Sequence, residues 1–210
     1  MLALGTTTTY QARHTVIRQG AESHSVLVLL SGSVKVTVDS EFGRTALLAV
    51  RGPGDLLGEM AVLERRRRAA NAVTCGAVRA KLIKGTHFLE FLDRNPDAWR
   101  LVARSLSERL RSANRRRAEF VACPAPVRVG RVLVEIVRRH GERTPAGWNL
   151  SVSLTQTEIA TLAGVALGTL EKALQSMQRQ GLVRRHYRRI VVEDMSGLCR
   201  FGGLPYRNPY

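Results

Sequence analysis

The sequence predicts an α+β fold, with an N-terminal antiparallel β-barrel or sandwich, a long helix and a C-terminal helix-turn-helix followed by a wing hairpin. Valine, leucine, isoleucine and threonine recur at spacings near two from Val16 to about Lys84, with glycines at the turns. From Pro96 to about Val121 the apolar spacing changes to three or four, which is typical of a helix. The stretch Leu154–Val183 then carries the spacing of two helices joined by a tight turn.

Length and composition restrict the class of protein. The chain has 210 residues, of which 44% are hydrophobic, enough to bury one or two ordinary cores. The sequence contains no apolar run of the roughly 20 residues that span a bilayer, and its start lacks the pattern of a signal peptide. Its three cysteines are too far apart for a metal clip or a disulfide framework. We therefore expect a cytoplasmic protein with no membrane partner and no bound metal.

The unusual property of the chain is its charge. Lysine and arginine number 33 against 17 aspartates and glutamates, a formal net charge of +16. Such a balance favours a polyanionic partner, nucleic acid first and a membrane surface second, because neutralised phosphates release their counterions. Residues 1–95 carry 13 basic and 8 acidic side chains, whereas residues 96–210 carry 20 and 9. We expect the polyanion to bind mainly to the C-terminal half.

The N-terminal domain is expected to span residues 1–95. Turns are predicted at its glycines, and Gly43 is the expected turn of a hairpin. The segment LLGEMAVLE, starting at Leu56, interrupts the strand rhythm, so it predicts a short helix inserted between two strands. This inserted segment carries the first candidate site.

A helix is expected over residues 96–122. Trp99, Leu106, Ala113 and Phe120 are seven residues apart and form a heptad-like seam, which favours a dimer interface through residues 97–121. Packing of the same helix against the barrel is the alternative. Two prolines at residues 123–126 break the helix and predict a hinge.

A helix-turn-helix is predicted within a domain over residues 127–196. Thr155 with Glu158 forms a capping box, which marks the start of the first helix. Ala160, Gly164 and Leu170 then occupy the places for a small residue at the helix crossing, a residue with positive φ in the turn and a core residue. These positions predict the first helix and the turn.

The second helix is expected over residues 166–180, with Gly181 after its end. Two apolar fragments around a basic tip at residues 184–189 follow, and they predict a wing. An ordinary helical hairpin beside a solvated arginine cluster is the alternative. Earlier in this domain, residues 142–153 are expected to form a loop leading to a short strand. Residues 197–210 are expected to form an irregular tail.

The inserted segment combines Gly58, Glu59 and Arg68. An arginine can bind a phosphate in a bidentate pair, a carboxylate can accept a hydrogen bond from a ribose hydroxyl, and a helix start offers backbone N–H groups. This combination predicts a nucleotide phosphate site inside the barrel. A solvated basic turn over Arg65–Arg68 is the alternative reading.

The order of these motifs is similar to one known family. R-Q-G at 18–20, L-L-S-G at 29–32, G-P-G-D at 52–55, G-E-M-A-V-L at 58–63 and R-A-A at 68–70 precede the long helix and the helix-turn-helix. Over roughly residues 10–195 the chain resembles the cAMP receptor protein and fumarate-nitrate regulator (Crp/Fnr) family of bacterial transcription factors. The resemblance implies a barrel of cyclic-nucleotide-binding type, a dimerisation helix and a winged helix-turn-helix.

The resemblance also implies an effector site. In members that bind cyclic nucleotides, the residues matching Glu59 and Arg68 contact the ribose 2′-OH and the cyclic phosphate. The chain departs from these members at Ala69, where a serine is common, and at Ala113 and Asn114, where a threonine or serine contacts adenine. The effector-site residues expected on this basis are Gly58, Glu59, Met60, Arg68, Ala69 and Asn114.

The implied DNA-reading surface departs from the family too. Where members that bind the best-known operator have Arg, Glu and Arg, this chain has Leu167, Gly168 and Lys172. Leucine and glycine cannot make bidentate contacts with base edges, so a different operator is expected. The DNA-binding residues expected are Thr155, Gln156, Ala166, Leu167, Thr169, Lys172, Gln175, Arg184, Arg185, Arg188 and Arg189.

The leading hypothesis is a homodimeric regulator that binds double-stranded promoter DNA and responds to a small effector. The candidate effector is cAMP or cGMP, and RNA polymerase is a further candidate partner. The alternatives are a regulator that needs no cyclic nucleotide, and an interaction module that binds no DNA.

The iron-sulfur members of the family that the chain resembles need four cysteines, three of them clustered near the N-terminus. The chain has three cysteines, of which Cys75 is the first, so no iron-sulfur cluster is expected. No haem is expected, since nothing orients His14, His24 or His87, and no catalytic residues are predicted.

Overall fold

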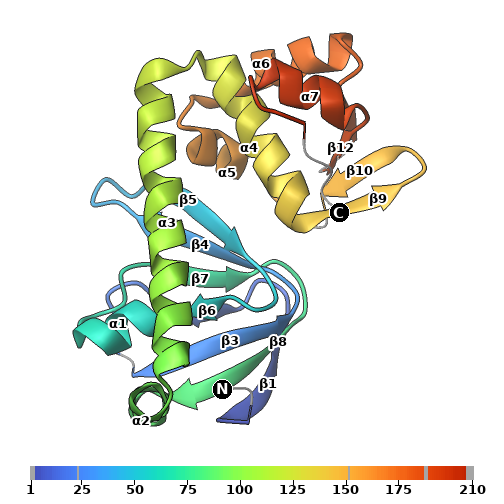
Figure 1. Cartoon of the computed structure of the whole chain (residues 1–210). Coiled ribbons are helices and arrows are strands. Elements are labelled where there is room, and N and C mark those ends of the chain that lie inside the picture. The colour runs from blue at the N-terminus through green and yellow to red at the C-terminus, as the bar shows by residue number, and fades with distance from the viewer. Residues whose placement is uncertain (1–2, 23, 151, 187–188, 207–210) are drawn as a thin grey trace. The chain divides into compact units, whose positions relative to one another are not determined.

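The computed structural model describes residues 3–22, 24–150, 152–186 and 189–206. The chain forms two compact units, Met1–Arg115 and Arg116–Tyr210 (Figure 1). The long helix contributes to both, so the units are treated one at a time below.

The first unit holds two four-stranded antiparallel sheets, ordered β1-β8-β3-β6 and β2-β7-β4-β5 (Figure 1). The predicted class is confirmed, although the strands form two sheets instead of one closed barrel. β1 was not expected, despite its run of β-branched threonines. The strands are β1 (Thr6–Tyr10), β2 (Thr15–Ile17), β3 (Ser25–Ser31), β4 (Val34–Asp39), β5 (Thr45–Arg51), β6 (Leu56–Leu57), β7 (Asn71–Thr74) and β8 (Val78–Lys84).

The two sheets share one core. Leu27 and Leu29 of β3 and Ala80 of β8 meet Val34 of β4 and Ala72 of β7, and all five are at most 2% exposed. Gly43 turns the chain between β4 and β5 at a φ of 70°, as predicted. Burial of alternate apolar side chains from both sheets therefore holds this unit together.

Helices lie outside the first sheet. They are α1 (Glu59–Glu64), α2 (Gly85–Arg94) and α3 (Pro96–Ala122), and a second core joins Phe88, Leu92 and Val102 to Ile83 of β8. The inserted helix and the long helix are thus confirmed. The first half of α3 packs on the sheet, which was the alternative to a dimer seam, while Leu110 farther along is 62% exposed.

α4 (Ala125–His140) begins before the end of the expected hinge at residues 123–126. Only Cys123 and Pro124 separate α3 from α4. Pro126 fits into the first turn of α4, because the amide that proline lacks has no helical partner there.

The second unit packs helices and one four-stranded sheet around a core. Leu133 of α4, Ile159 of α5, Leu170 and Leu174 of α6 and Leu198 of α7 are at most 1% exposed. The sheet order is β11-β12-β10-β9. The elements after α4 are β9 (Gly141–Thr144), β10 (Gly147–Leu150), α5 (Gln156–Ala163), α6 (Leu167–Arg179), β11 (Val183–His186), β12 (Arg189–Val192) and α7 (Met195–Phe201).

Two expectations for this unit were wrong. Residues 142–153 were expected to form a loop leading to a short strand, but residues 141–150 form the hairpin β9-β10, in which Gly147 has a φ of 123°. The tail was expected to be irregular, but it begins within α7. Asp194 caps α7 by accepting a hydrogen bond from the amide of Gly197 at 2.8 Å. Residues 207–210 of the expected tail lie outside the described residues.

Candidate functional site

The first candidate site is formed where α1 begins. Gly58 has a φ of 85°, a left-handed conformation that favours glycine, and a Cβ there would collide with the guanidinium of Arg68. Arg68 donates one hydrogen bond to the carbonyl of Gly58 and one to the carbonyl of Ser25, both at 2.6 Å. The expected pair of Gly58 and Arg68 is therefore brought together by direct contact.

Glu59, the first residue of α1, is 2% exposed. Its Oε1 accepts a hydrogen bond from Arg109 of α3, which also donates to the carbonyl of Leu56 at 2.6 Å. Arg109 lies on the same face of α3 as Val102 and Leu106, which pack on the sheet. An ion pair thus joins the inserted helix to the long helix within the first unit.

The charges of the site are only partly balanced. Oε2 of Glu59 is buried and has no hydrogen-bond partner among the described residues. Arg68 is 3% exposed, and burial lowers the pKa of its guanidinium, an effect that the Glu59 carboxylate opposes. A buried acceptor with a free oxygen beside a buried cation suits a ligand that supplies a hydroxyl donor and an anionic group.

The other expected effector residues, apart from Gly58, are exposed. Met60 is 42% exposed, and Ala69 and Asn114 are exposed, with no hydrogen bond to Glu59 or Arg68 in the described part of the chain. Ser25 and Arg109 were not predicted. For Arg109 the available signal was its helical spacing from Val102 and Leu106. Ser25 places its hydroxyl 3.4 Å from the guanidinium of Arg68.

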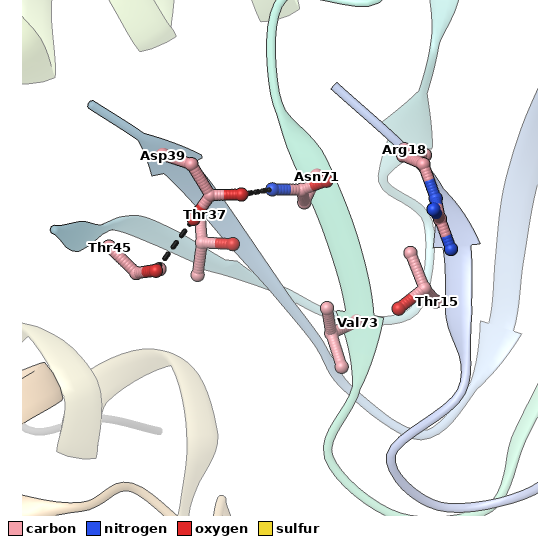
Figure 2. A pocket seen from close by; sticks show the side chains of 7 residues that line it. All are labelled: Thr15, Arg18, Thr37, Asp39, Thr45, Asn71 and Val73. Atoms are coloured by element: carbon pink, nitrogen blue, oxygen red, sulfur yellow. Dashed lines mark hydrogen bonds between the residues drawn. The ribbon is translucent and has the colours of Figure 1, made fainter. Parts of the chain in front are cut away.

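A separate hollow of about 350 Å³ opens on the second sheet (Figure 2). The carboxylate of Asp39 accepts hydrogen bonds from Thr45 at 2.6 Å and from Asn71 at 2.8 Å. Both bonds lower the pKa of Asp39, and the bond from Thr45 has the larger effect. The hollow and the Glu59 site are formed by different residues. Its walls are Thr15, Arg18, Thr37, Asp39, Thr45, Asn71 and Val73.

The second candidate site is the helix-turn-helix α5-α6. Thr155 caps α5 by accepting a hydrogen bond from the amide of Glu158 at 3.2 Å, and Glu158 accepts one from the amide of Thr155 at 2.7 Å. Gly164 has a φ of 62° in the turn, and Leu170 is completely buried. The predicted capping box, turn glycine and core position are all confirmed.

Arg128 of α4 forms hydrogen bonds with the turn between α5 and α6. Its guanidinium donates to the carbonyls of Ala163 at 3.1 Å and Gly164 at 2.9 Å, and it also donates to the carbonyl of Cys123 at 2.9 Å. It lies 5.0 Å from the centre of the Phe120 ring. One arginine that the sequence did not single out therefore supplies donors to the free carbonyls at the end of α5.

The outward face of α6 contains most of the expected base-reading residues. Leu167, Lys172 and Gln175 are exposed, whereas Thr169 is half-buried. Ala166 is the N-cap residue of α6 but makes no side-chain cap. Of the expected residues on α5, Thr155 is exposed and Gln156 half-buried.

The wing is the hairpin β11-β12. Arg184 forms an ion pair with Glu193, while Arg185 is half-buried and no hydrogen bond or ion pair is recorded for it among the described residues. Arg188 lies outside the described residues, and so does the side chain of Arg189. The structure thus gives the predicted wing with one of its arginines already paired.

Neither a metal site nor a membrane span is found in the part of the chain that the structure describes. No three His, Cys, Asp or Glu side chains of those residues gather as metal ligands would. No helix among them is both long and apolar enough to cross a bilayer.

Two family models match the chain. Residues 7–95 match the cyclic nucleotide-binding domain, and residues 127–201 match the Crp-like helix-turn-helix domain. The first match contains Gly58, Glu59 and Arg68 but ends before Arg109, and the second contains α5, α6 and the wing.

Several characterised proteins resemble the chain over most of its length. It is 29% identical to the CRP-like cAMP-activated global transcriptional regulator of Mycobacterium tuberculosis over 187 residues, which are 89% of this chain and 84% of that protein. The cAMP-activated global transcriptional regulator CRP of Escherichia coli is 24% identical over 185 residues, 87% of each chain.

Solved structures share the fold. A CRP-family transcriptional regulator from Thermus thermophilus matches with a TM-score of 0.79 at 23% identity, over 93% of this chain and 96% of that one. FixK2 from Bradyrhizobium japonicum also has a TM-score of 0.79, at 21% identity, over 94% and 97% of the two chains.

The buried ion pair yields a stability prediction. Replacing Arg109 with alanine leaves the Glu59 carboxylate buried without its cation, so the free energy of unfolding should fall by about 3 kcal/mol in urea denaturation. Arg111→Ala, an exposed change on the same helix, is the control and should stay within about 0.5 kcal/mol of the parent. Glu59→Gln should recover part of the loss in the Arg109→Ala background, and an Arg109→Ala variant as stable as the control would contradict the role of the pair.

Proposed function

Because the chain belongs to the Crp/Fnr family of transcription regulators, we propose that it is a homodimer that binds specific promoter sites and responds to a small effector beside Glu59 and Arg68. The observation that carries DNA binding is the exposed face of α6 next to a basic wing. A helix of this kind enters the major groove while the wing contacts the backbone. We place the protein in the cytoplasm, with RNA polymerase as a further partner.

The homodimer is supported by the apolar side chains of α3 that stay uncovered in one chain. Trp99 and Phe120 of the heptad-like seam are 38% and 61% exposed, and Leu110, one helical turn after Leu106 on the same face, is 62% exposed. A second copy of α3 would bury them. Two recognition helices in one dimer would then read two half-sites about one helical turn apart.

The effector is proposed to be a cyclic nucleotide. The free oxygen of Glu59 suits a ribose hydroxyl, and the guanidinium of Arg68 suits a phosphate. The relatives from Mycobacterium tuberculosis and Escherichia coli are cAMP-activated by name. Arg68 already bonds to the carbonyls of Gly58 and Ser25, which favours the second candidate, a regulator that binds DNA without a cyclic nucleotide.

DNA binding is tested with duplexes selected from a random pool, by fluorescence anisotropy over a range of salt concentrations. Affinity should fall steeply with salt. Arg185→Ala should weaken binding to all duplexes and lower the salt slope by about one, whereas Lys172→Ala should change the preferred sequence. Arg139→Ala removes an exposed arginine of α4 and serves as the control. Equal binding to all duplexes at physiological salt would refute the proposal.

The dimer is tested by sedimentation of a seam variant. Leu110→Glu places a charge in the proposed interface and should shift the protein to monomer, because two like charges would be buried together. Leu101→Glu is the matched control, since Leu101 is 67% exposed but lies on another face of α3. A monomeric parent protein, or equal behaviour of the two variants, would argue against this interface.

The effector is tested by calorimetric titration with cAMP and cGMP. Binding of one nucleotide should weaken at least about tenfold in Arg68→Lys, because lysine cannot form the bidentate contact. Arg67→Lys is the control, since Arg67 is exposed and pairs with Glu22. If neither nucleotide binds while the protein still selects DNA sites, the regulator without a cyclic nucleotide is the correct reading.

A further inference from the structure

The first turn of α6 presents an apolar edge where a base-reading helix usually carries polar side chains. We call residues 166–168 the apolar edge. Leu167 is 42% exposed, and the two residues beside it are alanine and glycine. In contrast, Leu170 and Leu174 on the same helix are completely buried. Packing of the domain therefore uses the other leucines and leaves Leu167 at the surface.

Gly168 has no structural reason to be glycine. It is not among the residues with positive φ, and a Cβ built on it would meet no atom within 4 Å. Glycine disfavours a helix relative to alanine, so this residue weakens α6 without a gain in packing. Because Gly168 has no side chain beside Leu167, another molecule can approach the backbone closely there.

Major-groove chemistry identifies the group that fits. Guanine, adenine and cytosine present hydrogen-bonding atoms on this edge, and among the four bases only thymine adds a methyl group there. An exposed leucine can make no polar contact, but it gains free energy by covering a methyl group. The absent Cβ at Gly168 would let the base pair come close enough for that contact.

We propose that Leu167 recognises the 5-methyl group of a thymine in each half-site, and that Gly168 permits the close approach. This inference rests on the proposed DNA-binding function and adds the base that the apolar edge selects. It explains how a recognition helix without Arg at residue 167 can still discriminate between bases.

The test uses a duplex selected from a random pool, with each thymine replaced in turn by uracil. Uracil keeps the pairing and hydrogen-bonding edge of thymine and removes only the methyl group. Replacement at one position of each half-site should weaken binding roughly fourfold per contact, the value expected for one buried methylene group. The same replacement should have no effect on Leu167→Ala, measured by fluorescence anisotropy.

Gly168→Ala separates recognition from folding. The variant should unfold at a higher temperature, because alanine favours the helix, yet bind the selected duplex at least about fourfold more weakly, because its Cβ blocks the approach. Gln178→Ala, an exposed change near the other end of α6, is the control and should not weaken binding.

The outcomes distinguish this inference from the proposed function. A protein that selects no duplex overturns both. A protein that selects a site but shows no thymine-to-uracil effect, or shows the same effect in Leu167→Ala, overturns the inference alone. Unchanged DNA affinity in Gly168→Ala overturns the role of the glycine.

Discussion

The burial of Glu59 is the constraint on which the first unit depends. Burying a carboxylate that is 2% exposed costs free energy unless a cation and hydrogen-bond donors meet it. Arg109 supplies both to Oε1 and so fixes α3 against the inserted helix α1. The other oxygen still has no donor among the described residues. A hydroxyl placed at that oxygen would therefore lower the cost of its burial.

The far end of α3 is held by charges as well, within the second unit. Arg116 pairs with Glu135 and Glu119 pairs with Arg131, both at 3.0 Å, and all four side chains are at most 25% exposed. Such partly buried pairs are screened less by solvent than the exposed pair of Arg100 with Asp97. Since α3 is one continuous helix and the units divide after Arg115, this helix joins the two units covalently.

The sequence was sufficient for several features that depend on near neighbours, although it missed the hairpin β9-β10 and the helix α7. The capping box of Thr155, the positive φ of Gly164 and the inserted helix all follow from residues a few positions apart. It was insufficient for the arginines that hold the sites. Arg109 meets Glu59 across 50 residues, and Arg128 meets Gly164 across 36. Among 33 basic side chains, the spacing of Arg109 from Val102 and Leu106 marks the buried face of its helix, but only the fold shows that Glu59 is its partner.

The two helices of the DNA-binding motif begin in opposite ways, and the difference has a physical basis. α5 has a complete capping box, and Arg128 satisfies the carbonyls at its end. α6 has Ala166 as its N-cap residue, which provides no side-chain cap, and begins at Leu167 with glycine as its second residue. Its stability comes instead from Leu170, Leu174 and Met177, all completely buried. Because the core holds α6 in place, the first turn of α6 need not contribute to helix stability. The residues of this turn are therefore free to suit the molecule that they contact.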